Sequence, residues 1–193
     1  MPFVQMIDKN LPPNRLHAIR FGLWIAMASI CMMFGAFTSA YLVRKPAGNW
    51  YEFKLPEHFF FSTLIIILSS IFIEWAYQQF KKGNERNYQY GVLLGFIFGI
   101  GFLIAQVFAW KALFAQGITI NLNVSGSFLY LISGIHALHV LGGIGALLVS
   151  VITAYTFDFD NSPNRKLRFD LVRQYWHFVD VLWIYLLVFL IIQ

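Results

Sequence analysis

Five long apolar stretches dominate the sequence and leave few options for the fold. They lie at residues 20–42, 59–80, 88–114, 127–155 and 169–192. Each is long enough for the roughly 20 helical residues that cross the hydrocarbon layer of a membrane. The stretches are continuous rather than alternating, which argues against a β-barrel. With 59% hydrophobic and 12% charged residues, the composition is not that of a soluble domain. We predict an all-α integral membrane protein with five transmembrane helices in a single domain, residues 1–193.

The lysines and arginines between these stretches predict the orientation. Ten of the 14 fall in the N-terminal segment, the second loop and the fourth loop, and four fall in the first and third loops. Because loops on the cytoplasmic side are enriched in these residues, we expect the N-terminus inside and the C-terminus outside. The formal charge of +5 fits this topology and a weak attraction to anionic lipids, so no nucleic-acid partner is expected. Cys31 is the single cysteine, which excludes a disulfide within the chain.

The informative residues are the few polar side chains inside the apolar stretches. They are Glu74, Gln106, His136, His139, His177 and Asp180. Burying such groups in a bilayer costs several kcal/mol unless they find partners. His136 and His139 are spaced i, i+3, as are His177 and Asp180, so each pair shares one helix face.

Two chemical interpretations of these residues are possible. His136, His139 and His177 could bind a metal or a haem, but few carboxylates or cysteines accompany them. His139 and His177 also differ in depth by about 12 Å at a rise of 1.5 Å per residue. Asp180, His177 and Glu74 could form a proton or ion path, but the outer half of the protein offers almost no further ionisable groups.

A structural interpretation explains the same residues better. Polar side chains that face the bundle interior hydrogen-bond across helices, and each such bond adds about 0.5 to 2 kcal/mol. We therefore expect an interhelix polar network and no catalytic, cofactor or metal site in this chain. In this network Asp180 accepts a hydrogen bond from His177 or from a histidine of the fourth span, and Trp176 and Trp183 fill the interface.

Several of these stretches resemble subunit III of haem-copper terminal oxidases. The resemblance rests first on GIHALHVLGG (134–143) and YWHFVDVLW (175–183), which are similar to signatures of the last two helices of that family. Three further segments match in order: RFGLWIAMASICMMFGAFTSAY (20–41), FKLPEHFFFSTLIIILSS (53–70) and FLIAQVFAW (102–110). Five spans resemble the short bacterial form, without the two additional helices of the mitochondrial type.

The resemblance implies a V-shaped helix bundle that holds phospholipid in its cleft and packs against the catalytic subunit I. It implies a non-redox part of a cytochrome c oxidase in the bacterial cytoplasmic (inner) membrane, with haems and copper in subunits I and II. The implied roles are assembly, support of proton uptake by subunit I and protection of the oxidase during turnover. Cytochrome c or a respiratory supercomplex would be reached through other subunits. The inventory agrees, because five histidines and one cysteine are too few for the metal centres of subunits I and II.

Two departures from the family pattern shift the expected role. The opening helix has Ala28 and Ser29 where the family commonly has a carboxylate, and Ala109 stands before Trp110 where a glutamate is frequent. The missing carboxylate of the opening helix favours a lipid and assembly role over direct proton movement by this subunit. Candidate contacts with lipid headgroups are Arg20, Arg86 and Arg173.

Three alternative functions stay open at the level of the sequence. One is subunit III of a quinol oxidase, which has the same size and helix number, since the electron donor is chosen by subunit II. The others belong to different classes: a small membrane transporter and a membrane cytochrome with two histidine ligands.

Overall fold

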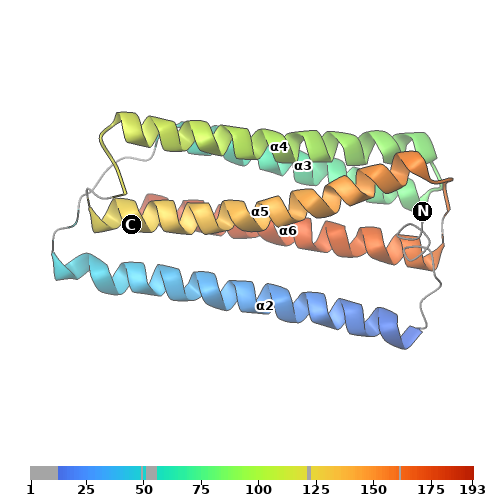
Figure 1. The fold of residues 1–193 in the computed structure, drawn as a ribbon, viewed down its shortest axis with the longest axis horizontal. Helices are drawn as coiled ribbons and strands as arrows, with labels where there is room; N and C mark the ends of the chain where they lie inside the picture. Colours follow the sequence, from blue (N-terminus) through green and yellow to red (C-terminus); the bar gives the residue numbers. More distant parts are fainter. Residues whose placement is uncertain (1–12, 49, 51–55, 121–122, 161) are drawn as a thin grey trace.

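Five long α-helices make up most of the protein (Figure 1). The computed structural model describes residues 13–48, 50, 56–120, 123–160 and 162–193. In this part of the chain the helices are α2 (Pro13–Arg44), α3 (His58–Lys81), α4 (Glu85–Ala115), α5 (Val124–Thr156) and α6 (Pro163–Ile192), with a short 3₁₀ helix, η1 (Lys45–Ala47), after α2 and no β-strand. All five are long and apolar enough to cross a membrane. The predicted all-α architecture with five spans is confirmed.

The helices extend beyond the predicted apolar stretches because their first turns are polar and capped. Asn84 precedes α4 and accepts a hydrogen bond from the amide of Asn87, at 3.4 Å. Asn123 does the same for α5 through the amide of Ser125, at 3.2 Å. Ser162 caps α6, so that this helix begins six residues before residue 169. Caps satisfy the backbone N–H groups of the first turn, so a helix can begin in water before it enters the membrane. Hydrophobicity therefore predicts the membrane-spanning segment but not the residue at which the helix begins.

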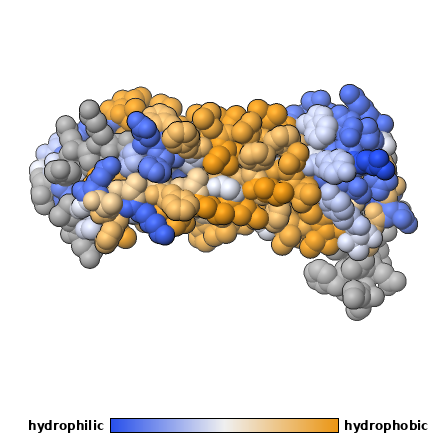
Figure 2. Space-filling view, turned by 90° about the horizontal axis from the view of Figure 1, so that it is seen from above, coloured by the Kyte–Doolittle hydropathy of each residue, from blue (hydrophilic) through white to orange (hydrophobic). Residues whose placement is uncertain are grey.

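The surface shows the pattern of a multi-pass membrane protein. The face in Figure 2 has a broad hydrophobic zone across the middle of the molecule with hydrophilic residues toward both ends. Consecutive helices run in opposite directions, so α2 begins at one end of the molecule and α6 finishes at the other (Figure 1). Which end faces the cell interior stays a prediction, and Lys9 and Lys54, two of the charges behind it, lie outside the described residues.

Helices α3 to α6 form a tightly packed bundle. Glycines bring α4 close to α3: a Cβ atom on Gly91 would lie 2.8 Å from the Cβ of Ala76, and one on Gly95 would meet the side chain of Ile73. Such small residues let helix backbones approach closely in lipid, where van der Waals packing drives association. The centre of the bundle contains Trp176 and Trp183, both fully buried.

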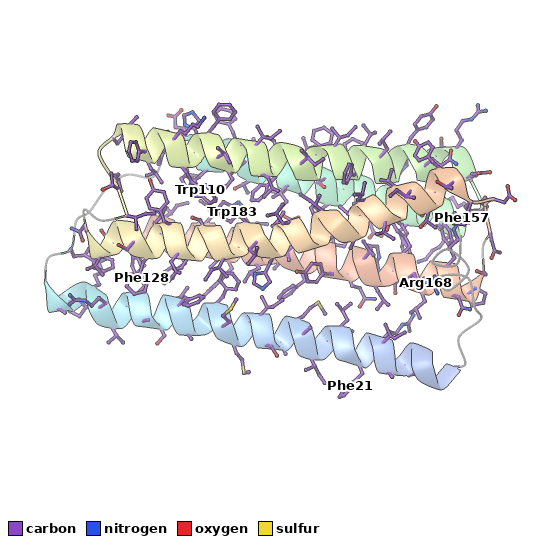
Figure 3. The ribbon with its side chains drawn as sticks, viewed as in Figure 1. Phe21, Trp110, Phe128, Phe157, Arg168 and Trp183 are labelled. Carbon is purple, nitrogen blue, oxygen red and sulfur yellow. The ribbon has the colours of Figure 1, made fainter. Side chains whose placement is uncertain are left out.

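Helix α2 lies along one side of this bundle, against α5 and α6 (Figure 1). Only 11% of its membrane window is buried, against 33–44% for the other helices. Its inward residues include Phe34 and Thr38, and the Thr38 hydroxyl is 3.1 Å from the hydroxyl of Tyr185 on α6. Figure 3 shows Phe21 on the outer side of α2 and Trp183 inside the bundle. The first helix is therefore a loosely attached arm beside a compact four-helix unit.

Candidate functional site

A charged cluster joins α2, α3 and α6 near the end of the molecule where α2 and α6 begin. Arg173 on α6 donates hydrogen bonds to Glu74 of α3 at 2.6 Å and to Asp170 of its own helix at 2.8 Å. Arg20 of α2 lies 3.8 Å from the other Asp170 oxygen. Two cations thus face two carboxylates, and the cluster is close to neutral. This balance lets charged groups sit at the membrane boundary, because each finds a partner.

His177 extends this charged cluster into the apolar part of the bundle. Its Nδ1 is 3.3 Å from the Ser70 hydroxyl, and its Nε2 is 3.3 Å from the Glu74 carboxylate. Both ring nitrogens are therefore engaged by α3, rather than by Asp180 as the sequence had suggested. Asp180 lies one turn further along α6 and is buried. Its Oδ1 has no partner among the described residues.

Trp176 connects all four helices of the bundle. Its indole nitrogen donates to the Ser69 hydroxyl at 3.1 Å, and Ser69 donates to the carbonyl oxygen of Gly95 at 2.6 Å. Its ring lies on Gly99 of α4 and Gly143 of α5, where a Cβ atom would be 2.9 Å from the ring at either position. One side chain thus unites α3, α4, α5 and α6, and the two glycines provide the space for it.

Replacing Ser69 by alanine should lower the stability of the bundle by about 1 kcal/mol, the upper part of the range for interhelix hydrogen bonds in membranes. Ser69 serves two partners on two other helices, so its loss leaves the Trp176 indole unpaired. Ser150→Ala is the matched control, because that hydroxyl bonds only to Ala146 of its own helix. Unfolding of the purified protein in mixed micelles measures both; equal losses would show that the interhelix bonds of Ser69 contribute nothing.

The two histidines of α5 lie apart from His177. His136 is fully buried and stacks on Trp183 with ring centroids 5.0 Å apart, while Phe34 and Phe102 approach its ring edge-on. Neither ring nitrogen of His136 has a partner among the described residues. His139 is half-buried and its Nδ1 pairs with the carbonyl of Ile135 at 2.8 Å. Within the described part of the chain, no three histidine, cysteine or acidic side chains are placed to hold a metal ion.

Gln106 forms a separate polar contact between α3 and α4. Its side-chain oxygen accepts a hydrogen bond from Ser62 at 3.4 Å, and its nitrogen has no partner in the described residues. One turn away, Trp110 donates to Ser133 of α5 at 3.1 Å. The predicted polar network is thus a set of separate contacts rather than one cluster. Glu74 and His177 share the charged cluster, and His136 and His139 share the ring of Phe34. Trp176 and Gln106 each have their own surroundings.

The surface between α2 and α6 contains an open, mainly apolar groove. Its volume is about 370 Å³, and its lining residues are Met27, Arg173, Gln174, His177, Phe178 and Val181. Arg173 lines the groove, but its guanidinium group forms ion pairs with Glu74 and Asp170. Of the other predicted lipid contacts, Arg20 is half exposed beside the same cluster and Arg86 is exposed at the start of α4.

Sequence reasoning missed Asp170 and the serines of α3. Asp170 stands i, i+3 from Arg173 and i, i+7 from His177, so one helix face carries all three, and this spacing could have identified it. Ser69 and Ser70 gave a weaker signal, because a serine inside a transmembrane helix often bonds only to its own backbone. Ser62 does so with the carbonyl of Phe59, at 2.9 Å.

Comparisons with known proteins identify the family of this chain. Residues 15–192 match the family model of cytochrome c oxidase subunit III. The "Probable cytochrome c oxidase subunit 3" of Rickettsia bellii is 27% identical, covering 97% of this chain and 73% of that protein. Its counterpart in Mycobacterium tuberculosis is 28% identical, covering 89% of this chain and 86% of that protein. "Cytochrome c oxidase subunit 3" of Oryctolagus cuniculus is 32% identical over 66% of this chain, and the match spans about half of that protein (47%).

The fold and the family match lead to one conclusion. The five transmembrane helices carry the G-x-H-x-L-H-V and WHFVD segments in their expected order, and the family model covers nearly the whole chain. The chain therefore belongs to the cytochrome c oxidase subunit III family.

Proposed function

We propose that this chain is a non-redox accessory subunit of a respiratory haem-copper oxygen reductase of the cytochrome c oxidase type. It supports assembly of the complex and sustained proton-coupled oxygen reduction by subunit I in aerobic electron transport. The observation that carries the proposal is the use of the membrane-embedded polar side chains: Trp176, His177 and Arg173 are all engaged with residues of α3 or α6. Side chains committed to holding helices together suit a scaffold subunit.

The proposal places the haems and copper in partner subunits I and II and none in this chain. The contacts of His177 support this, because both of its ring nitrogens already face Ser70 and Glu74. A haem or copper ligand needs a free nitrogen aimed at an open position. Subunit III of a quinol oxidase is the second candidate. The names of the relatives, all of them cytochrome c oxidase subunit 3, favour cytochrome c as the ultimate electron donor.

We also propose that membrane lipid binds to this single-domain protein. The apolar walls of the groove between α2 and α6 suit an acyl chain, and Arg20 and Arg86 are available for headgroups. Arg173 is a weaker candidate for an anionic headgroup, because two carboxylates already neutralise it. With the N-terminus inside, all three arginines would lie at the cytoplasmic face of the bacterial inner membrane, where inside-positive residues are expected.

His177→Ala should weaken association with subunit I and leave the haem absorbance of the assembled complex unchanged. The variant removes the contacts with Ser70 and Glu74 and loosens α6 against α3 without touching a redox centre. The measurement is the ratio of this chain to haem after purification through a tag on subunit I. A complex that keeps the mutant chain in full amount but loses a haem would refute the structural role of His177.

An affinity tag on this chain provides the direct test of the proposed function. Purification in mild detergent should recover subunits I and II, a haem spectrum and cyanide-sensitive oxygen consumption with reduced cytochrome c. Recovery of a complex that oxidises only quinol would select the second candidate. A solute flux in liposomes from this chain alone would favour a transporter, and a Soret band in the isolated chain would favour a di-histidine cytochrome.

A further inference from the structure

Helix α2 is attached to the bundle along only part of its length. None of residues 17–33 is buried, whereas the next turns of the helix carry Phe34, Thr38 and Tyr41, which are all buried. In Figure 1 the α2 ribbon runs away from α6 toward the end of the molecule where both helices begin. The helix therefore has two unequal parts, a first half (17–33) beside the bundle and a second half (34–44) packed against it.

Aromatic contacts fix the second half of α2. The ring of Phe34 approaches His139 of α5 with the ring centroids 5.8 Å apart. The ring of Tyr41 meets Phe128 of α5 at 5.7 Å and Phe189 of α6 at 5.2 Å. All three contacts are edge-to-face, the arrangement that the charge distribution of aromatic rings favours. These rings tie the second half to both neighbouring helices.

Two polar contacts reinforce this attachment. The Thr38 hydroxyl lies 3.1 Å from the Tyr185 hydroxyl of α6. The ammonium group of Lys45, directly after α2, donates a hydrogen bond to the main-chain oxygen of Gln193. Hydrogen bonds between helices are among the contacts that hold a helix in place within lipid. The second half cannot leave α6 without breaking them, so it is the fixed end of α2.

The attachment weakens along the first half. Ile30 and Met33, next to the second half, are partly buried against the bundle. One turn earlier, Met27 is the α2 residue that lines the open groove of about 370 Å³. Near the start of the helix, Arg20 lies 3.8 Å from Asp170, and its side chain is 49% exposed. An ion pair this long and this exposed contributes little and is screened by salt, so only a weak contact holds this end of α2 in place.

We propose that α2 is a hinged arm that opens and closes the groove between α2 and α6. Residues 34–41 are the pivot, and the ion pair between Arg20 and Asp170 is the latch that holds the arm closed. At 1.5 Å per residue the first half is about 24 Å long, so a tilt of about 10° moves its far end by about 4 Å. This movement widens the groove and gives the membrane more access to Arg173 and His177, which line it. The inference goes beyond the proposed function and does not depend on it.

Distances between pairs of spin labels in the full-length chain, held in lipid nanodiscs, test the hinge. In a Cys31→Ser background, Phe21→Cys with Lys166→Cys reports on the first half of α2 against α6. Leu42→Cys with Val188→Cys reports on the second half, and all four native side chains are exposed. We expect a broad distribution with closed and open populations for the first pair and a narrow one for the second. Two narrow distributions would refute the movement, and two broad ones would refute the pivot.

Arg20→Gln tests the latch. The loss of one exposed ion pair should raise the ratio of open to closed arms about threefold in the first pair of labels and leave the second pair unchanged. Lys82→Gln is the matched control, because it removes an exposed cation from the same end of the molecule; it should behave as wild type. Raising the salt concentration to about 1 M should open the arm of the wild-type chain in the same way, which tests the latch without a substitution. A first-pair distribution that neither Arg20→Gln nor salt alters would overturn the proposal.

Discussion

Replacing Gly143 by leucine should displace Trp176 and remove this chain from the purified complex. A Cβ atom at this position would lie 2.9 Å from the Trp176 ring, and the rest of a leucine side chain needs space that the ring occupies. Overpacking of a filled interior costs up to about 3 kcal/mol, and here the displaced ring also loses its bond to Ser69. The measurement is the amount of this chain that co-purifies with the haem-containing subunits, together with its melting temperature in detergent.

The matched control is Gly145→Leu on the same helix. A Cβ atom at Gly145 meets nothing within 4 Å, so the bundle should tolerate leucine there. Its melting temperature should stay near that of wild type even if this face of α5 contacts a partner subunit. Equal destabilisation by both substitutions would mean that leucine in α5 lowers the stability in general, and that a clash with the Trp176 ring is not the cause.

The second large effect is expected from Arg173→Leu. The substitution leaves Glu74 and Asp170 facing each other at the membrane boundary with only Arg20 nearby. We expect a loss of about 2 kcal/mol, between the values for exposed and for buried ion pairs. The loss should fall on the contact between α3 and α6, because Arg173 is the cation that joins Glu74 to α6, whereas the pair between Asp170 and Arg20 of α2 stays in place. Unfolding of the purified protein in mixed micelles measures this loss.

Two further variants separate the ion pairs from the overall loss of charge. Arg168→Leu removes a cation from the same helix, at a position labelled in Figure 3 near the same end of the bundle, without breaking an ion pair among the described residues. It should have little effect. Adding Glu74→Gln to Arg173→Leu removes one of the two opposed carboxylates and should recover part of the lost stability. If the double variant is no more stable than Arg173→Leu alone, repulsion between the carboxylates is not the cause.

The helices were predictable from the sequence because the bilayer imposes a length and an apolar composition on each of them. The membrane segments lie inside the observed helices, and the first turns of α2 and α6 were missed because they are polar and lie beyond the hydrophobic stretch. The i, i+3 spacing correctly placed His177 and Asp180 on one face of α6. The same spacing placed His136 and His139 on one face of α5, where the ring of Phe34 contacts both.

The partners of the polar residues were not predictable, because they depend on the rotation of one helix against another. His177 was expected to bond to Asp180 or a histidine of α5, but it faces Ser70 and Glu74 of α3 instead. Periodicity defines which residues share a face, and only packing decides which helix that face meets. The glycines of α4 set this packing, since Gly91 and Gly95 bring α4 against α3. The sequence showed these glycines as a small-residue cluster without showing their partners.

Native mass spectrometry of the affinity-purified oxidase tests most directly the claim that this chain is a scaffold without a redox centre. Ejected from the complex in the gas phase, the chain should have the mass of its polypeptide, alone or with bound phospholipid, while haem and copper stay with the other subunits. An ejected chain that carries haem or a metal ion in stoichiometric amount would contradict the account.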